Sequence, residues 1–174
     1  NLRFADDLLL VAQPREEIVV MLADLREGAR EVGLELHGDK TKLLTNQVEA
    51  DRSDVVIDGC RFQVLPYDGA TTYLGRLLNL SPARHDIELD SRIEKAWRKF
   101  MNLRDELCGK PYPLKDRLRL FNATVTRTAL YGCGSWAMTF ARASRLRAAQ
   151  RLMLRKFVGT GRRPVEDRGE SSSS

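Results

Sequence analysis

Apolar and polar positions follow two different periods along the chain, and the change of period divides the chain into two halves. Over residues 1–79, short apolar runs separated by polar turns predict strands, with one helix among them. From residue 80 onward, apolar residues recur every three or four positions, which predicts helices. We therefore expect an α+β protein, with a mixed domain over 1–79, a helical domain over 80–159 and a disordered tail over 160–174.

The first predicted hairpin carries two adjacent acidic residues. Leu2 and Phe4 precede Asp6 and Asp7, and the apolar run 8–11 follows them. Such runs predict buried strands, and the polar pair between them predicts the tip of a tight hairpin. At about 5 Å and an effective dielectric of about 20, two carboxylates repel by roughly 3 kcal/mol. A divalent cation such as Mg²⁺ would remove that cost, whereas a solvated turn is the alternative explanation of the pair.

The remainder of the first half predicts one helix and four short strands. The helix covers residues 14–32 and ends at Gly33. The strands are expected at 42–44, 55–57, 62–65 and 72–74. The second and third of them are joined by Asp58 and Gly59, a hairpin signal. Asp39, Asp54 and Asp58 fall in predicted turns, where we expect solvated carboxylates.

The second half predicts three amphipathic helices. Ser81 and Pro82 open the first of them, whose apolar face runs over 89–107. A break at 109–113 separates it from a second helix with an apolar face over 118–129. The third helix has its apolar face over 140–157.

Three arginines follow one another at four-residue intervals on the third predicted helix. At about 100° per residue, Arg147, Arg151 and Arg155 line a different side of the helix from its apolar residues. Arginine forms bidentate contacts with phosphate, so this row could follow a nucleic-acid backbone without recognising sequence. A solvated helix face explains the row nearly as well.

Composition and charge restrict the partners of the chain. Residues 1–75 carry 8 Lys and Arg against 14 Asp and Glu, whereas residues 76–174 carry 21 against 10. The basic half is a candidate nucleic-acid surface. The 3 cysteines form no CxxC pair, so neither a zinc site nor a disulfide framework is indicated. No signal peptide and no apolar run of membrane-spanning length is present, so we expect an intracellular protein of the nucleus or cytoplasm, without a membrane partner.

Several segments of the chain follow the order of motifs in a known enzyme family. The first segment, Phe4-Ala5-Asp6-Asp7, resembles the palm box of reverse transcriptases of the LINE type, the enzymes of non-LTR retrotransposons, in which Tyr is commoner than Phe at the first position. Segments similar to later motifs of the family follow in the same order: Gly33-Leu34-Glu35-Leu36 with Lys40-Thr41-Lys42, Tyr73-Leu74-Gly75, the run 130–136 with Trp136, and Gln150-Arg151 to Val158-Gly159. The resemblance covers almost all of residues 1–159.

The resemblance implies the end of a right-hand polymerase palm, with antiparallel strands plus one helix, followed by a helical thumb. It makes Asp6 and Asp7 the catalytic ligands of Mg²⁺ (two ions in the complete enzyme, with Mn²⁺ as the other candidate). It assigns the primer 3′ end to Phe4 and to Tyr73, Leu74 and Gly75, for which a core aromatic and an ordinary strand are the alternatives.

Further implied contacts concern phosphates and the thumb core. Lys40 and Lys42 join the arginine row Arg147, Arg151 and Arg155 as candidates for contacting phosphates, although a solvated charged loop explains the two lysines equally well. We expect three aromatic residues to lie in the thumb core, with base-stacking platforms as the alternative: Trp97, Tyr131 and Trp136. The implied partners are an RNA template, a DNA primer and deoxynucleoside triphosphates.

The same resemblance implies that segments preceding residue 1 are needed. The fingers, the first palm carboxylate and the nucleotide-selecting segment of the family have no counterpart in this sequence, and the chain begins without Met, so we expect a fragment. Two-metal phosphoryl transfer uses two cations about 3.5–4 Å apart, and two adjacent carboxylates cannot hold both. We expect the isolated chain to be inactive. The alternatives are a truncated or domesticated remnant that only binds nucleic acid, and a basic helical protein with a coincidental Asp–Asp turn.

Overall fold

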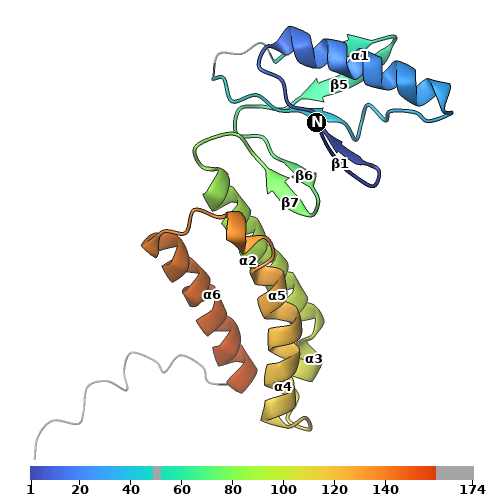
Figure 1. The fold of residues 1–174 in the computed structure, drawn as a ribbon. Helices are drawn as coiled ribbons and strands as arrows, with labels where there is room; N and C mark the ends of the chain where they lie inside the picture. Colours follow the sequence, from blue (N-terminus) through green and yellow to red (C-terminus); the bar gives the residue numbers. More distant parts are fainter. Residues whose placement is uncertain (49–51, 160–174) are drawn as a thin grey trace, which may run out of the picture. The chain divides into compact units, whose positions relative to one another are not determined.

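The computed structural model describes residues 1–48 and 52–159 and contains both helices and small sheets (Figure 1). The chain forms two compact units, Asn1–Ile87 and Glu88–Ser174. The division between them therefore lies further along the chain than the expected boundary at residue 79. The tail expected to be disordered, 160–174, lies outside the described residues.

Helix α1 spans Arg15–Glu31 in the first unit and confirms the helix predicted over residues 14–32. Pro14 precedes it in an extended conformation, and the missing N–H of proline leaves no donor unsatisfied at a helix start. At the other end, the Leu34 N–H donates to the Ala29 carbonyl at 2.8 Å, across Gly33 with φ of 74°. This closure requires a left-handed residue, which glycine supplies without steric cost.

A three-stranded sheet in the order β3-β5-β4 lies in the first unit, and β5 is visible beside α1 in Figure 1. Strands β4 (Val55–Ile57) and β5 (Cys60–Val64) form the predicted antiparallel hairpin. Asp58 and Gly59 form its turn with φ of 45° and 76°, the conformation that Asp-Gly pairs favour.

Strand β3 (Lys42–Leu43) pairs with β5 in parallel, so the expectation of antiparallel strands throughout is wrong here. Lys42 lies opposite Gln63, and Leu43 lies opposite Val64. The pairing joins segments about twenty residues apart, which leaves no local turn signal in the sequence. The sheet and α1 share an apolar core, whose buried members are Leu22, Val55, Phe62 and Val64.

A second hairpin joins β6 (Thr71–Tyr73) to β7 (Arg76–Leu78) in the first unit. Leu74 and Gly75 form its two-residue turn, with φ of 48° and 76°. The expected strand over 72–74 therefore ends one residue early, and β7 was not predicted. Leucine is unusual at a left-handed position, which is why the sequence carries no conventional turn signal here.

The connection that follows β7 is held by a buried amide. The Asn79 side chain is 5% exposed, and its Nδ2 donates to the carbonyls of Asp68 and Gly69 at 2.7 Å each. Its Oδ1 accepts from the Ser81 backbone N–H at 2.8 Å. Helix α2 begins three residues later, at Arg84, with the Arg84 N–H donating to the Ser81 carbonyl.

Helices make up the described part of the second unit, and they confirm the three predicted helical segments. The first comprises α2 (Arg84–Asn102) and, after a break at Leu103, the short α3 (Arg104–Cys108). The second is a column of α4 (Leu114–Phe121), a π-helical segment (Asn122–Thr126) and α5 (Arg127–Ala129). The third is α6 (Phe140–Val158), which lies beside that column in Figure 1.

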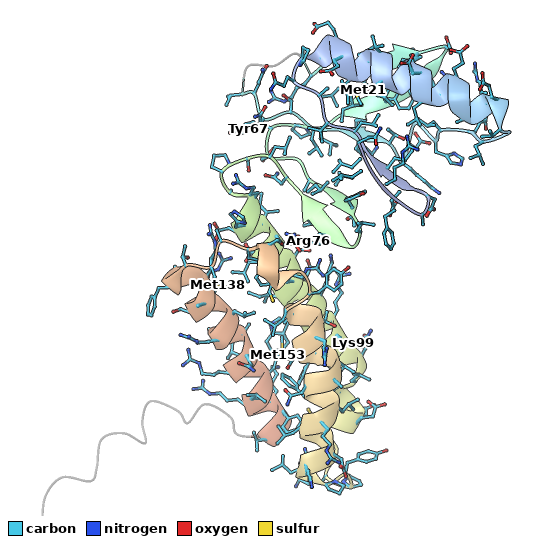
Figure 2. All side chains as sticks on the ribbon, in the orientation of Figure 1. Met21, Tyr67, Arg76, Lys99, Met138 and Met153 are labelled. Carbon is cyan, nitrogen blue, oxygen red and sulfur yellow. The ribbon has the colours of Figure 1, made fainter. Side chains whose placement is uncertain are left out.

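Three phenylalanines join these helices. The Phe121 ring lies 6.3 Å from the Phe100 ring and 6.2 Å from the Phe157 ring, and both pairs are edge-to-face. All three side chains are at most 3% exposed. Edge-to-face packing is favourable beyond the burial of apolar area. Met153 completes the contact from α6, on the side of that helix that faces the α4 column in Figure 2.

A buried ion pair lies on α2 in the second unit. Arg92 Nε donates to Glu88 Oε1 at 2.7 Å, and the side chains are 5% and 2% exposed. The Arg92 guanidinium also lies over the Tyr131 ring, 4.7 Å from its centroid. Arg145 of α6 pairs with Asp90 of α2 at the surface. Separating a buried pair would leave each charge uncompensated, so we expect Glu88 and Arg92 to stay together. Because Arg92 also contacts the Tyr131 ring, we expect the pair to hold the segment around Tyr131 in place.

No helix in the described part of the chain combines the length and the apolar character needed to cross a lipid bilayer.

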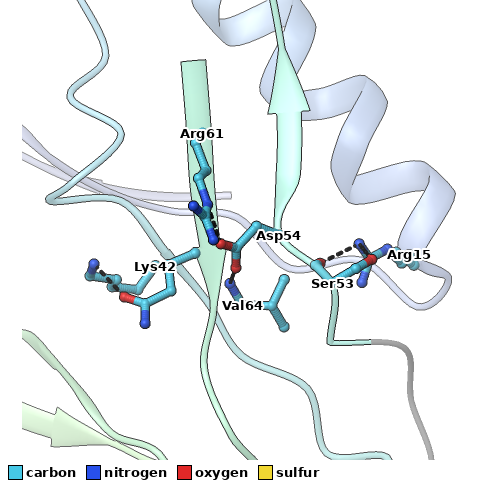
Figure 3. A network of polar contacts seen from close by, with 7 residues as sticks. Arg15, Lys42, Ser53, Asp54, Arg61 and Val64 are labelled. Atoms are coloured by element: carbon cyan, nitrogen blue, oxygen red, sulfur yellow. Dashed lines mark hydrogen bonds and ion pairs between the residues drawn. The ribbon is translucent and has the colours of Figure 1, made fainter. Parts of the chain in front are cut away.

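The Asp54 carboxylate accepts hydrogen bonds from two residues of strand β5 (Figure 3). Its Oδ1 accepts from the Val64 backbone N–H at 3.1 Å, and its Oδ2 accepts from Arg61 Nε. The side chain is 18% exposed, so the expectation of a solvated turn carboxylate is wrong for Asp54. The Val64 N–H, and then the Arg61 guanidinium, lower the pKa of this carboxyl below its ordinary value of 3.8, against a smaller opposing effect of burial.

Replacing Phe121 by Ala is expected to destabilise the second unit by about 3–5 kcal/mol, because it empties the centre of the aromatic cluster. Both tryptophans, Trp97 and Trp136, lie in this unit, so urea unfolding followed by tryptophan fluorescence reports on it. Phe140→Ala is the matched control, since Phe140 is 84% exposed and should change stability by no more than about 0.5 kcal/mol. Equal effects of the two substitutions would contradict this cluster as the core.

Asp54 is expected to make the first unit sensitive to acid. Because folding lowers its pKa, the unfolded chain binds the proton more readily, so the stabilisation is present above pH 3.8 and is lost as pH falls through the lower folded-state pKa. Urea unfolding followed by far-UV circular dichroism from about pH 6 to about pH 2 measures this dependence. Asp54→Asn should flatten it, and Arg61→Gln should weaken it without removing it. An Asp54→Asn protein with the wild-type dependence would contradict the assignment.

Candidate functional site

The acidic pair lies at the tip of the hairpin formed by β1 (Leu2–Phe4) and β2 (Asp7–Leu9), as predicted. Ala5 and Asp6 form the two-residue turn, and Phe4 lies opposite Asp7 as the closing pair. Ala5 has φ of 52°, a left-handed value that costs a non-glycine residue roughly 1 kcal/mol. Asp6 therefore occupies the turn itself, and Asp7 begins the second strand.

Both carboxylates and most of the hairpin face solvent, so the expectation that these strands are buried is wrong for the described chain. Asp6 and Asp7 are exposed, and the Leu2 and Phe4 side chains are 61% and 64% exposed. Leu10, just beyond β2, packs against the core of the first unit. The hairpin is thus attached to that core beyond β2, while its tip carries two accessible carboxylates beside an uncovered aromatic ring.

The donor set at this tip fits part of a magnesium site. Adjacent carboxylates are the ligand type that Mg²⁺ takes, usually one or two of them together with water and phosphate oxygens. Among residues 1–48 and 52–159, however, no group of three or more Asp, Glu, His or Cys side chains is placed to hold a metal ion. Asp6 and Asp7 can contribute two ligands, and a two-metal site would need a third carboxylate from elsewhere.

Three of the four residues expected to position a primer lie in the β6–β7 hairpin. Tyr73 ends β6 and lies opposite Arg76, whereas Leu74 and Gly75 form the turn between the strands. The expectation that Leu74 continues a strand is wrong. Leu74 is 37% exposed, so a hydrophobic side chain projects from a narrow turn.

The two lysines expected to meet phosphate differ in their surroundings. Lys40 is exposed in a turn, where its backbone N–H donates to the His37 carbonyl at 3.2 Å. The Lys42 ammonium donates to Gln63 Oε1 at 2.8 Å, directly across the parallel β3–β5 pair (Figure 3). Lys42 is therefore partly committed to the sheet, and Lys40 is the better candidate for contacting a phosphate.

The arginine row of α6 is exposed as the helical periodicity predicts. Arg147, Arg151 and Arg155 are all exposed, whereas Met153 and Phe157 on the other side are each 3% exposed. At 1.5 Å rise per residue, the four-residue spacing sets successive guanidinium stems about 6 Å apart. In Figure 2, nitrogen-tipped side chains project from the side of α6 that faces away from the α4 column. The row can therefore approach an extended anion without disturbing the core.

The aromatic residues assigned to the helical core behave differently from one another. Trp97 packs against the phenylalanine cluster, 5.7 Å from the Phe100 ring, and Trp136 is 8% exposed, which confirms both as core. Tyr131 is 51% exposed, so its assignment to the core is wrong. Tyr131 lies beyond the end of α5 (Arg127–Ala129), directly before Gly132, whose φ is 72°.

Comparison with known proteins relates the chain to a transposable element. No protein-family model matches the chain, and no solved structure matches it. Over 166 residues it is 34% identical to an uncharacterized protein of Caenorhabditis elegans that is described as transposon-derived. The alignment covers 91% of this chain and 56% of the relative, so the chain spans little more than half of that protein's length. The chain is thus similar to a transposon-derived protein along nearly all of its sequence.

Proposed function

We propose that this chain is the C-terminal palm and thumb segment of an RNA-directed DNA polymerase from a non-LTR retrotransposon. The observation that carries the proposal is the placement of Asp6 and Asp7 at the exposed tip of the β1–β2 hairpin, within the Phe-Ala-Asp-Asp box. The ordered resemblance of the later segments supports it. So does the similarity to a protein described as transposon-derived.

In this proposal, the hairpin holds the metal ligands and the neighbouring aromatic residue supports the primer end. Asp6 and Asp7 would hold the cations, with Asp6 as the principal ligand and Asp7 as the adjacent one. Bound Mg²⁺ would act as a Lewis acid that stabilises charge on the attacking and leaving oxygens. The exposed Phe4 ring, which lies opposite Asp7, provides an apolar surface against which a primer sugar or base can pack. Tyr73, Leu74 and Gly75 hold the primer backbone.

The second unit contributes binding in this proposal. The exposed row of Arg147, Arg151 and Arg155 contacts backbone phosphates, and phosphate contacts fix orientation without recognising sequence. The fixed fork of each guanidinium suits bidentate contacts with phosphate. Met153 and Phe157 on the opposite side of α6 pack into the aromatic cluster and so hold the helix that carries the row.

A remnant that only binds nucleic acid is the second candidate. It is favoured by the lack of a three-ligand acidic group in the described part of the chain, because the arginine row needs no metal. Template-dependent incorporation of deoxynucleotides separates the two candidates. A longer parent protein with this activity supports the polymerase, and a folded parent that binds duplex but extends no primer supports the remnant.

In a parent protein that extends primers, Asp6→Asn is expected to lower the rate by several orders of magnitude. The loss of one metal ligand removes several kcal/mol of charge stabilisation in the transition state, and each 1.36 kcal/mol is worth about tenfold. Single-turnover incorporation with Mg²⁺ measures the effect. Asp39→Asn is the control, since Asp39 is an exposed carboxylate in another turn. A folded Asp6→Asn protein with more than about a tenth of the wild-type rate would exclude Asp6 as a ligand.

The isolated 174-residue chain serves as a second arm of the same test. It is expected to extend no primer, because Asp6 and Asp7 have no third carboxylate beside them in the described residues. Dideoxynucleotide-sensitive incorporation by the purified chain would contradict this expectation.

Changing Arg147, Arg151 and Arg155 together to Ala is expected to weaken the salt dependence of duplex binding. Each phosphate contact contributes a slope of about −0.9 to log K against log salt on B-form DNA, so the triple variant should lose about 2 to 3 units. Fluorescence anisotropy of a labelled primer–template duplex at several salt concentrations measures the slope. The matched control replaces Lys99, Lys110 and Lys115, three exposed lysines on other segments of the same unit, and so removes the same charge. Equal slope changes in the two variants would show that the slope depends on the net charge of the unit and not on the position of the arginine row.

A further inference from the structure

The π-helical segment, α5 and the two residues that follow α5 line an open pocket on the second unit. Its volume is about 470 Å³, and its lining consists of Asn122, Thr126, Arg127, Leu130 and Tyr131. Small-molecule sites commonly have volumes of roughly 300–1,000 Å³. All five residues belong to one continuous stretch of chain, so the pocket does not depend on how the two units are arranged.

The π-helical segment shapes this pocket. Thr124 Oγ1 donates to the Leu120 carbonyl at 2.6 Å, and Thr128 Oγ1 donates to the Thr124 carbonyl at 2.9 Å. Such back-bonding by threonine perturbs a regular helix, and single π-helical turns occur frequently at functional sites. Asn122, Thr126 and Leu130 then follow at four-residue intervals and form one wall. Thr126 Oγ1 donates to Asn122 Oδ1 at 3.2 Å, so the groups that the wall offers to a ligand are the Asn122 Nδ2 donor, the Thr126 hydroxyl oxygen as an acceptor, and an apolar side chain.

Tyr131 provides a fixed aromatic surface at the end of the pocket. The buried Arg92 lies against its ring at 4.7 Å, and Glu88 holds Arg92 in turn at 2.7 Å. The tyrosine nevertheless remains 51% exposed. A ring held in this way loses little conformational freedom when a second flat group stacks on it.

Arg127 adds an exposed positive charge beside this aromatic surface. It is exposed on α5 and lines the pocket together with Tyr131. An aromatic ring, a guanidinium and a side-chain amide are the groups that bind unpaired bases: bases stack on aromatic rings and on guanidinium planes, and amides bind their edges. A paired base inside a duplex has no free face for such stacking.

We propose that this pocket binds an unpaired nucleobase of single-stranded nucleic acid. The base stacks on Tyr131, Asn122 and Thr126 bind its edge, and Arg127 contacts the adjoining phosphate. The inference deepens the proposed function, because it rests on nucleic acid being the ligand of this unit. It uses side chains of the π-helical segment, of α5 and of Tyr131 just beyond α5, whereas duplex binding was assigned to the α6 row.

The test compares three fluorescently labelled probes by anisotropy at fixed salt: a blunt duplex, the same duplex with a single-stranded overhang, and that overhang with abasic sites. The wild-type chain is expected to bind the base-bearing overhang roughly five-fold to a hundred-fold more tightly than the abasic one, the range for stacking of one base. Equal affinity for these two overhangs would overturn the proposal without any variant.

Variants then locate the base. Tyr131→Leu and Arg127→Gln are expected to abolish or reduce the preference for the base-bearing overhang, whereas Tyr131→Phe keeps the ring and should keep the preference. Tyr112→Leu is the matched control, because Tyr112 is 53% exposed in the same unit and does not line the pocket. A preference that persists in both folded Tyr131→Leu and Arg127→Gln proteins, as judged by their melting curves, would overturn the assignment to this pocket.

The same probes separate this inference from the proposed function. Loss of blunt-duplex binding in the Arg147, Arg151 and Arg155 variant, with an intact base preference, supports both assignments. A chain that binds the overhang through Tyr131 but shows no blunt-duplex binding supports the pocket and contradicts the duplex surface.

Discussion

The edge-to-face contacts of Phe100, Phe121 and Phe157 are the interaction on which the surfaces of the second unit depend. These rings come from α2, α4 and α6, so one cluster fixes all three helices against one another. Because side chains on a helix repeat every 3.6 residues, fixing the inner face of α6 also fixes its outer face. The arginine row is therefore oriented by residues on the other side of α6, and a cavity in the cluster would disturb the proposed binding without removing any charge.

The acidic hairpin obeys a different constraint. Two strands of three residues each cannot bury much apolar area, and an isolated two-stranded hairpin is marginally stable in water. Its exposed Phe4 lies opposite Asp7, and the exposed Leu2 lies on the same strand, an arrangement that favours a ligand or further strands over a purely solvated turn. The polymerase proposal accounts for this combination, since a primer end and additional palm strands would cover the apolar residues while leaving the carboxylates accessible to metal.

Local patterns predicted the elements well, and long-range contacts account for what they missed. Helical periodicity located α1, α2 and α6, and the Asp58 and Gly59 pair located the β4–β5 turn, because each of these signals lies within one segment. The parallel β3–β5 pairing was missed because it joins distant segments. The turn at Leu74 was missed because leucine rarely adopts φ of 48°.

The same limit applies to the candidate sites. Periodicity predicted the exposed arginine row, since exposure on a helix follows from spacing alone. The contacts of Asp54 and Tyr131 were not predicted, because each is made with a residue from another segment of the chain. The Asp54 carboxylate accepts from the Val64 N–H, and the Tyr131 ring lies against Arg92.

The two candidate functions differ in one place only. Both use the second unit to bind nucleic acid, so binding by that unit cannot distinguish a polymerase from a remnant. Only the hairpin can distinguish them, because accessible carboxylates contribute nothing to binding a polyanion unless a cation lies between the two.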